Sequence, residues 1–240
     1  MDFYSAISSY YNYIFPLNPD QRDFIRSFLP AGSRILEVGT ATGNLARALA
    51  RDGFQVVGVD LNASLLEKAR AEENPPDLKF FQMDMLDIDQ KFARGFFDGI
   101  VGVGNTLVHL SGREQIRTFL TGAARSLKPG GNLFLQTVNY DRVLKQNIYN
   151  LPTIENEKIQ FVRIYRHLPG QKRIIFQSRL RIKTTEEVLQ QEVQLFPLQK
   201  HELEADLKQA GFNHLEFFGD FQKAPYSQES MALVVRASIS

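Results

Sequence analysis

Short apolar runs alternate with amphipathic stretches along the first half of the chain. The run Ile35 to Val38 leads into the small residues GTATG (39–43), and a second run, FQVVGVD, ends on Asp60. Between the two, Leu45 and Leu49 lie four residues apart, and Gly53 stands where a helix C-cap belongs. Continuous apolar runs are typical of parallel strands covered on both faces. The pattern therefore predicts a strand, a tight turn, a helix and a second strand.

The same alternation continues to about residue 138. LKFFQM, FDGIVGVG and NLFLQTV have the pattern of further strands, and helical segments are expected up to residue 73 and up to Leu127. Such regular alternation predicts an α/β fold with a doubly wound parallel sheet. Ligands of these folds bind outside the carboxyl ends of the strands, where we expect Glu37, Asp60, Asp84 and Asn105.

Capping signals mark several helix starts. Residues 3–15 and 19–29 are expected to form two helices ahead of the first strand, with Asn18 as the cap of the second and Pro19 at its first position. Asn62 or Ser64 can cap the helix that follows Asp60. Ser111 followed by Glu114 predicts a capping box.

Residues 158–197 break the alternation. From Lys158 to Lys183 there are eight Lys or Arg and no acidic residue, and LPGQ (168–171) predicts a turn between two strand-like runs. In RIIFQSRLRIK most apolar residues are even-numbered and the cationic residues are odd-numbered, which gives one covered and one cationic face. We expect a three-stranded antiparallel insertion. Its cationic face fits an anionic substrate or RNA, or else solvent or a second subunit.

Composition excludes several classes of function. The chain has 240 residues and 43% hydrophobic content, enough for one elaborated domain, and it has no cysteine for disulfides or thiol catalysis. Its 28 basic and 27 acidic residues give no bulk attraction to nucleic acid or membranes. Neither a leader peptide nor an apolar run of about 18 residues is present, so we expect a soluble cytoplasmic protein. GxSxG and HExxH are absent and the four histidines are scattered, so we expect no metal site.

The turn at 39–43 also indicates the kind of ligand. Asp60 is placed to accept hydrogen bonds from a ribose. A dinucleotide fingerprint would end on a small residue where this chain has Asn44, and Glu37 would repel a pyrophosphate. An acidic residue there suits a cationic ligand. S-adenosylmethionine has a ribose and two cationic centres but no phosphate.

ILEVGTATG resembles the first motif of class I S-adenosylmethionine-dependent methyltransferases, with Ala41 in place of a glycine. LKFFQMDML, FFDGIVGVGNTLVHL and SLKPGGNLFLQT resemble the later motifs in order. The resemblance implies a seven-stranded, mostly parallel, Rossmann-like sheet that ends in an antiparallel hairpin, with an N-terminal helical lid over the cofactor. It implies cofactor contacts from Tyr11, Glu37, Gly39, Thr40, Gly43, Asp60, Leu61, Asp84, Met85 and Val103.

The second half is similar to the glycine and sarcosine N-methyltransferase group, through GNTLVHL, NYDRVL and NIY. This resemblance implies that Asn105 and His109 lie at the acceptor. That group has an arginine immediately before NYD for a substrate carboxylate, where this chain has Val138. The expected domains are a core of residues 1–138 and 198–240 and a small antiparallel β insertion of residues 139–197.

The function expected from the sequence is S-adenosylmethionine-dependent methyl transfer to nitrogen or oxygen of a small molecule. Displacement at a sulfonium needs alignment more than a strong base, so no catalytic triad is required. An RNA methyltransferase, a non-catalytic S-adenosylmethionine-binding protein and, more distantly, a dehydrogenase are the alternatives. The sequence leaves monomer and homodimer open.

Overall fold

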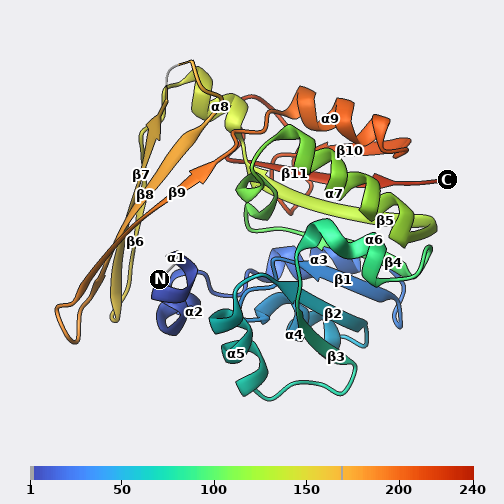
Figure 1. Ribbon diagram of the computed structural model, residues 1–240, viewed down its shortest axis with the longest axis horizontal. Helices are drawn as coiled ribbons and strands as arrows, with labels where there is room; N and C mark the ends of the chain where they lie inside the picture. Colours follow the sequence, from blue (N-terminus) through green and yellow to red (C-terminus); the bar gives the residue numbers. More distant parts are fainter. Residues whose placement is uncertain (1–2, 169) are drawn as a thin grey trace.

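A seven-stranded sheet forms the centre of the computed structural model, which describes residues 3–168 and 170–240 (Figure 1). The strand order is β10-β11-β5-β4-β1-β2-β3, with β1 to β5 parallel and β11 antiparallel to both β5 and β10. This confirms the expected fold class. The strands are β1 (Arg34–Val38), β2 (Gln55–Asp60), β3 (Leu78–Gln82), β4 (Phe97–Gly102), β5 (Leu127–Val138), β10 (His214–Phe218) and β11 (Ala232–Ser238).

Helices cover both faces of this sheet because successive strand residues point to opposite sides. In β1, Ile35 packs in one apolar cluster with α3 (Pro19–Arg26) and α4 (Asn44–Arg51). Its neighbour Leu36 packs in a second cluster with α7 (Arg113–Ser126) and α9 (Lys200–Gln209). The other helices after β1 are α5 (Ala63–Ala71), α6 (Ile88–Lys91), α8 (Tyr140–Lys145), η2 (Met85–Asp87) and η3 (Thr106–His109).

A second, antiparallel sheet has four strands in the order β6-β7-β8-β9. They are β6 (Asn150–Glu155), β7 (Ile159–His167), β8 (Ile174–Ile182) and β9 (Val188–Leu195). The prediction of three strands was wrong because it missed β6. This strand is at the edge, contains Pro152 and changes register between Leu151 and Ile154, so it lacks a clean alternation. Of the predicted turn LPGQ, Pro169 lies outside the described residues, and Gln171 N donates to Leu168 O at 3.1 Å.

Short N-terminal helices lie between the two sheets (Figure 1). They are α1 (Phe3–Ile7), η1 (Ser8–Tyr10) and α2 (Tyr11–Ile14), so the single helix expected over 3–15 is broken into three turns. Ile7 and Ile14 pack on one face of the antiparallel sheet, against Phe161 and Leu180. In β8 the alternation holds as expected from the sequence, since Leu180 is buried and its neighbours Arg179 and Arg181 are exposed.

Two of the expected helix caps are present and one is not. Asn18 accepts from Asp20 N at 3.0 Å and Asn62 accepts from Leu65 N at 2.9 Å. The capping box at Ser111 was a wrong prediction, because α7 begins after Gly112 without a side-chain cap. Ser111 N donates instead to Gln115 Oε1 at 2.8 Å. Across residues 3–168 and 170–240, the helices are too short or too polar to cross a membrane.

Candidate functional site

The turn after β1 requires two glycines. Gly39 has φ 68° and Gly43 has φ 75°, both in the left-handed region. A Cβ at Gly39 would lie 2.5 Å from Thr106 Cγ2, and one at Gly43 would lie 2.4 Å from Phe80 Cζ. Ala41 also has a positive φ, 50°, which costs an alanine free energy that a glycine would not lose.

Asp60 joins this turn to the loop after β2. Its Oδ2 accepts from Ala41 N and its Oδ1 accepts from Asn62 N, both at 2.8 Å. The Asn62 side chain in turn caps α5. One carboxylate at the end of β2 therefore fixes the backbone on both sides of the opening between β1 and β2.

A cavity of about 620 Å³ opens at the carboxyl ends of these strands. Its volume lies within the ordinary range of small-ligand sites, roughly 300 to 1,000 Å³. The lining includes seven of the residues expected from the sequence, namely Tyr11, Gly39, Asp60, Leu61, Met85, Val103 and His109. It also includes Tyr4 from α1, Thr106 from η3 and Val193 from β9, which the sequence did not indicate.

Five expected residues lie outside the cavity lining: Glu37, Thr40, Gly43, Asp84 and Asn105. Glu37 and Thr40 are buried beneath the turn, where Thr40 Oγ1 donates to Glu37 Oε2 at 2.6 Å. Burial raises the pKa of Glu37 to about 7, against the opposing effect of the Thr40 hydrogen bond. Gly43 is the N-cap residue of α4. Asp84 accepts from Leu86 N at 2.9 Å and caps η2.

The Asn105 side chain forms a hydrogen bond with the backbone at the end of β5. It has φ 69°, its Nδ2 donates to Tyr140 Oη at 3.1 Å, and its Oδ1 accepts from Val138 N at 3.0 Å. Its side chain is thus directed at the chain around residue 138. Val138 is the residue that stands where the resembled group has an arginine.

Tyr4 and His109 form a pair on the cavity wall. Tyr4 Oη lies 2.9 Å from His109 Nε2, and the two rings meet edge to face with centroids 5.5 Å apart. Burial lowers the pKa of His109 to about 4, so the imidazole is neutral at pH 7. Burial, followed by the charges of Tyr11 and Asp60, raises the pKa of Tyr4, so its hydroxyl keeps its proton.

Among the N-terminal tyrosines, Tyr4 and Tyr11 reach the cavity. Tyr11 was expected from the sequence, whereas the nearby Tyr13 is 47% exposed. A signal for Tyr4 was present, because it lies seven residues before Tyr11, a spacing that places two side chains on the same side of a helical segment. In the described part of the chain, no three His, Asp or Glu side chains are grouped closely enough to hold a metal ion.

Residues 35–131 match the family model described as "Methyltransferase domain". This matched segment of the chain is similar to that family. It contains the turn at 39–43, Asp60 and His109, but neither Tyr4 nor Val193.

Three known proteins show what this segment and the chain around it resemble. The ubiquinone biosynthesis O-methyltransferase of Xanthomonas oryzae pv. oryzae is 34% identical over 126 residues, which are 51% of this chain and 51% of that protein. The CcbJ methyltransferase from Streptomyces caelestis superimposes with a TM-score of 0.84 at 22% identity, over 100% of this chain and 99% of that chain. CalS10 with bound S-adenosylmethionine, an amino pentose methyltransferase from Micromonospora echinaspora involved in calicheamicin biosynthesis, gives a TM-score of 0.66 at 19% identity, over 92% and 89%.

The chain spans about half the length of the curated relatives it matches first. At identities of 22% and 19% the two structures establish likeness of fold. The enzyme class expected from the sequence agrees with all three comparisons, and the expected cofactor, S-adenosylmethionine, is the one bound in CalS10.

Proposed function

We propose that the protein is an S-adenosylmethionine-dependent methyltransferase that acts on nitrogen or oxygen of a small molecule. One observation carries the proposal: a single cavity is lined both by the Asp60 carboxylate, suited to a ribose, and by the neutral Tyr4–His109 pair. The first group suits the cofactor expected from the sequence, and the second offers hydrogen-bonding atoms for an acceptor.

The cofactor side would be formed by the residues that join β1 to β2. Asp60 would accept hydrogen bonds from the ribose hydroxyls, since a carboxylate oxygen can accept more than one hydrogen bond. Leu61, Met85 and Val103 would supply apolar surface to the adenine. Glu37, beneath the turn, would contribute negative charge toward the cationic end of the cofactor when it is ionised.

The acceptor side would be formed by Tyr4, Thr106, His109 and Val193. S-adenosylmethionine, when bound, supplies a methyl group activated by its sulfonium. The residues of this chain would orient the acceptor toward it and exclude water. Because His109 is neutral at pH 7, the pair can accept a hydrogen bond from the acceptor without adding a second positive charge to the cavity.

The nitrogen or oxygen acceptor, and the likeness to the glycine and sarcosine N-methyltransferase group, remain proposals. The likeness to the O-methyltransferase of Xanthomonas favours oxygen, and the likeness to CalS10, an amino pentose methyltransferase, favours nitrogen. We also propose that residues 139–197 are an acceptor-side insertion on a core of residues 1–138 and 198–240. The observation in favour of an acceptor-side role for the insertion is that Val193, in β9, lines the same cavity as Asp60.

RNA is not the favoured substrate. Four of the eight basic residues between 158 and 183 have acidic partners: Arg166 with Glu192, Lys172 with Glu202, Arg181 with Glu186 and Lys183 with Glu155. Neutralised pairs leave less charge for a phosphate backbone, on which sequence-independent RNA binding depends.

Two measurements test the proposal. Calorimetry with S-adenosylmethionine and with NADH asks which nucleoside binds, and binding of NADH alone would refute the cofactor assignment. Turnover of S-adenosylmethionine to S-adenosylhomocysteine is then measured with a panel of small amines, phenols and amino sugars, with structured RNA as a separate arm. Product with RNA and none with the panel would refute the small-molecule assignment.

A further inference from the structure

The base of the antiparallel sheet is attached to the chain on both sides of His109. On one side, Phe196 N, just after β9, donates to Val108 O at 2.8 Å. On the other side, the guanidinium of Arg173, directly before β8, donates to Ser111 O. The short segment between these two carbonyls contains His109, so the sheet contacts it before and after the imidazole.

The two contacts are part of one cluster around the Phe196 ring. Lys172 Nζ lies 4.9 Å and the Arg173 guanidinium 5.4 Å from the ring centroid, within the range of cation–π contacts. Lys172 Nζ also forms an ion pair with Glu202 in the first turn of α9. The Glu202 side chain is only 9% exposed, so this carboxylate is largely shielded from solvent.

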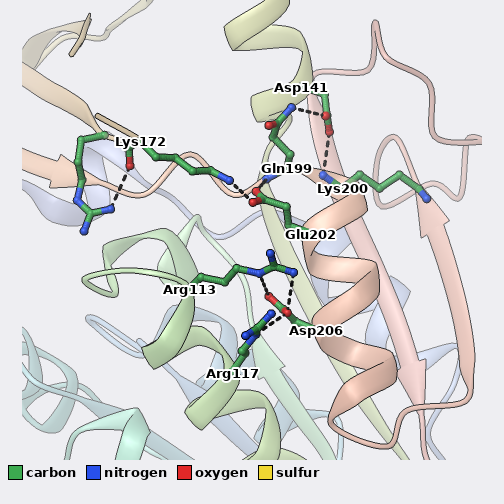
Figure 2. A network of polar contacts seen from close by, with 9 residues as sticks. Arg113, Arg117, Asp141, Lys172, Gln199, Lys200, Glu202 and Asp206 are labelled. Atoms are coloured by element: carbon green, nitrogen blue, oxygen red, sulfur yellow. Dashed lines mark hydrogen bonds and ion pairs between the residues drawn. The ribbon is translucent and has the colours of Figure 1, made fainter. Parts of the chain in front are cut away.

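Helix α9 also contacts the start of α7. Asp206, one turn after Glu202, has a side chain that is 1% exposed. Its two oxygens accept from Arg113 Nε at 2.8 Å and Nη2 at 2.9 Å, and from Arg117 Nε at 2.8 Å. Figure 2 shows Lys172 reaching the first turn of α9 and both arginines of α7 pointing at Asp206.

These contacts form a closed ring, because Arg113 is the first residue of α7 and lies two residues after Ser111. We call the set Ser111, Arg113, Lys172, Arg173, Phe196, Glu202 and Asp206 the anchor ring. Local opening would separate the buried carboxylates of Glu202 and Asp206 from their cationic partners, which is costly, so the ring resists local opening. The same strand, β9, that leads into Phe196 also carries Val193 of the cavity wall.

We infer that the anchor ring positions His109, and that Arg173 and Lys172 are positioning residues for the acceptor side of the cavity. The geometry of the ring stands by itself, but its importance for an acceptor rests on the proposed function. The ring fixes the distance between the wall formed by β9 and the turn that presents the imidazole to Tyr4. If the ring had a purely structural role, it would stabilise the fold, and removal of one of its contacts would leave the surroundings of His109 unchanged.

The test compares Arg173→Met with Arg179→Met. Both replacements keep an unbranched side chain, Arg173 directly before β8 and Arg179 within it, but Arg179 is exposed and makes no polar side-chain contact within the described residues. The titration of His109 is followed by NMR with nitrogen-labelled histidine, and S-adenosylmethionine affinity by calorimetry. The titratable side chain that contacts the imidazole is Tyr4.

In Arg173→Met we expect the pKa of His109 to rise from about 4 toward the ordinary 6.5, because the loosened turn admits water. In Arg179→Met the titration should match the unsubstituted protein. S-adenosylmethionine affinity should stay within about twofold in both, because the contacts of Asp60 are separate from the ring.

An unchanged His109 titration in Arg173→Met would overturn the inference, even if the melting temperature fell. If that variant does not fold, Glu202→Gln provides the same test, since it removes the charge that Lys172 meets. A shifted titration together with no methyl transfer to any compound in the panel would support the ring and refute the proposed function, so the two failures are distinguishable.

Discussion

Replacing Asp60 with alanine should weaken both the apo fold and the binding of S-adenosylmethionine. The change removes two bonds of 2.8 Å in which a carboxylate accepts from backbone N–H groups, at Ala41 and Asn62. Hydrogen bonds to charged groups contribute about 1.5 to 3 kcal/mol each, and the half-buried position of Asp60 favours the low end. Two such bonds at the low end predict that the free energy of unfolding falls by about 3 kcal/mol.

The effect on ligand binding has a second origin. Ala41 is held at φ 50°, a conformation that costs an alanine roughly 1 kcal/mol, and the bond from its N–H to Asp60 offsets that cost. Without Asp60 the turn relaxes and the ribose loses its acceptor. Together these losses predict an affinity lower by about 1 to 3 kcal/mol, or roughly 5- to 150-fold.

Calorimetry and urea denaturation measure the two effects separately, with Asp98→Ala as the matched control. Asp98 also accepts from a backbone N–H, that of Arg34 at 2.8 Å, and pairs with Lys128 at 2.6 Å, but at the opposite end of β1. Its replacement should lower stability and leave S-adenosylmethionine affinity unchanged. An affinity for Asp60→Ala within twofold of the unsubstituted protein would refute the ribose assignment.

Three further predictions concern the turn and the two titrating groups. Ala41→Gly should raise the free energy of unfolding by roughly 0.5 to 1 kcal/mol, because glycine adopts φ 50° without strain; a loss of stability in urea would contradict this. The pKa of His109 is lowered from 6.5 to about 4, so the unfolded chain binds more protons between those values, and stability should fall by up to about 3 kcal/mol as the pH drops through them. Urea denaturation at a series of pH values should show that loss disappear in His109→Gln. The pKa of Glu37 is raised from 4.5 to about 7, so here the folded chain binds the extra proton and stability should decrease as the pH rises from 4.5 to 7. Over the same rise the forming carboxylate should strengthen binding of the cationic cofactor, and calorimetry should find no such gain in Glu37→Gln.

Local signals in the sequence were enough to predict the central fold. The opposite burial of Ile35 and Leu36, the turn at 39–43 and the acidic end of β2 all depend on residues close together in the chain. Strand β6 was missed because an edge strand with a proline and a shifted register has no regular pattern.

The candidate site was predicted less completely, because a strand end fixes where a residue lies but not where its side chain points. Glu37 lies one residue before the end of β1, and Asp84 and Asn105 follow β3 and β4, as expected. Their side chains nevertheless bind nearby hydroxyl, amide or backbone groups outside the cavity lining. Tyr4 and Val193 reach the cavity only through the packing of α1 against β9, which involves residues nearly 190 positions apart.

The two sides of the cavity therefore have different origins in the chain. Asp60, Met85 and Val103 belong to residues 35–131, the part that matches the methyltransferase family model. Tyr4 and Val193 lie outside it, and His109, although inside, is held by the anchor ring from β8 and α9. The segment that matches the family model therefore contains the residues proposed for the cofactor, but it lacks Tyr4 and Val193 of the proposed acceptor side. Because specificity is a difference in binding free energy between competing ligands, changes at Tyr4, Val193 or the anchor ring can alter the acceptor while the S-adenosylmethionine side stays intact.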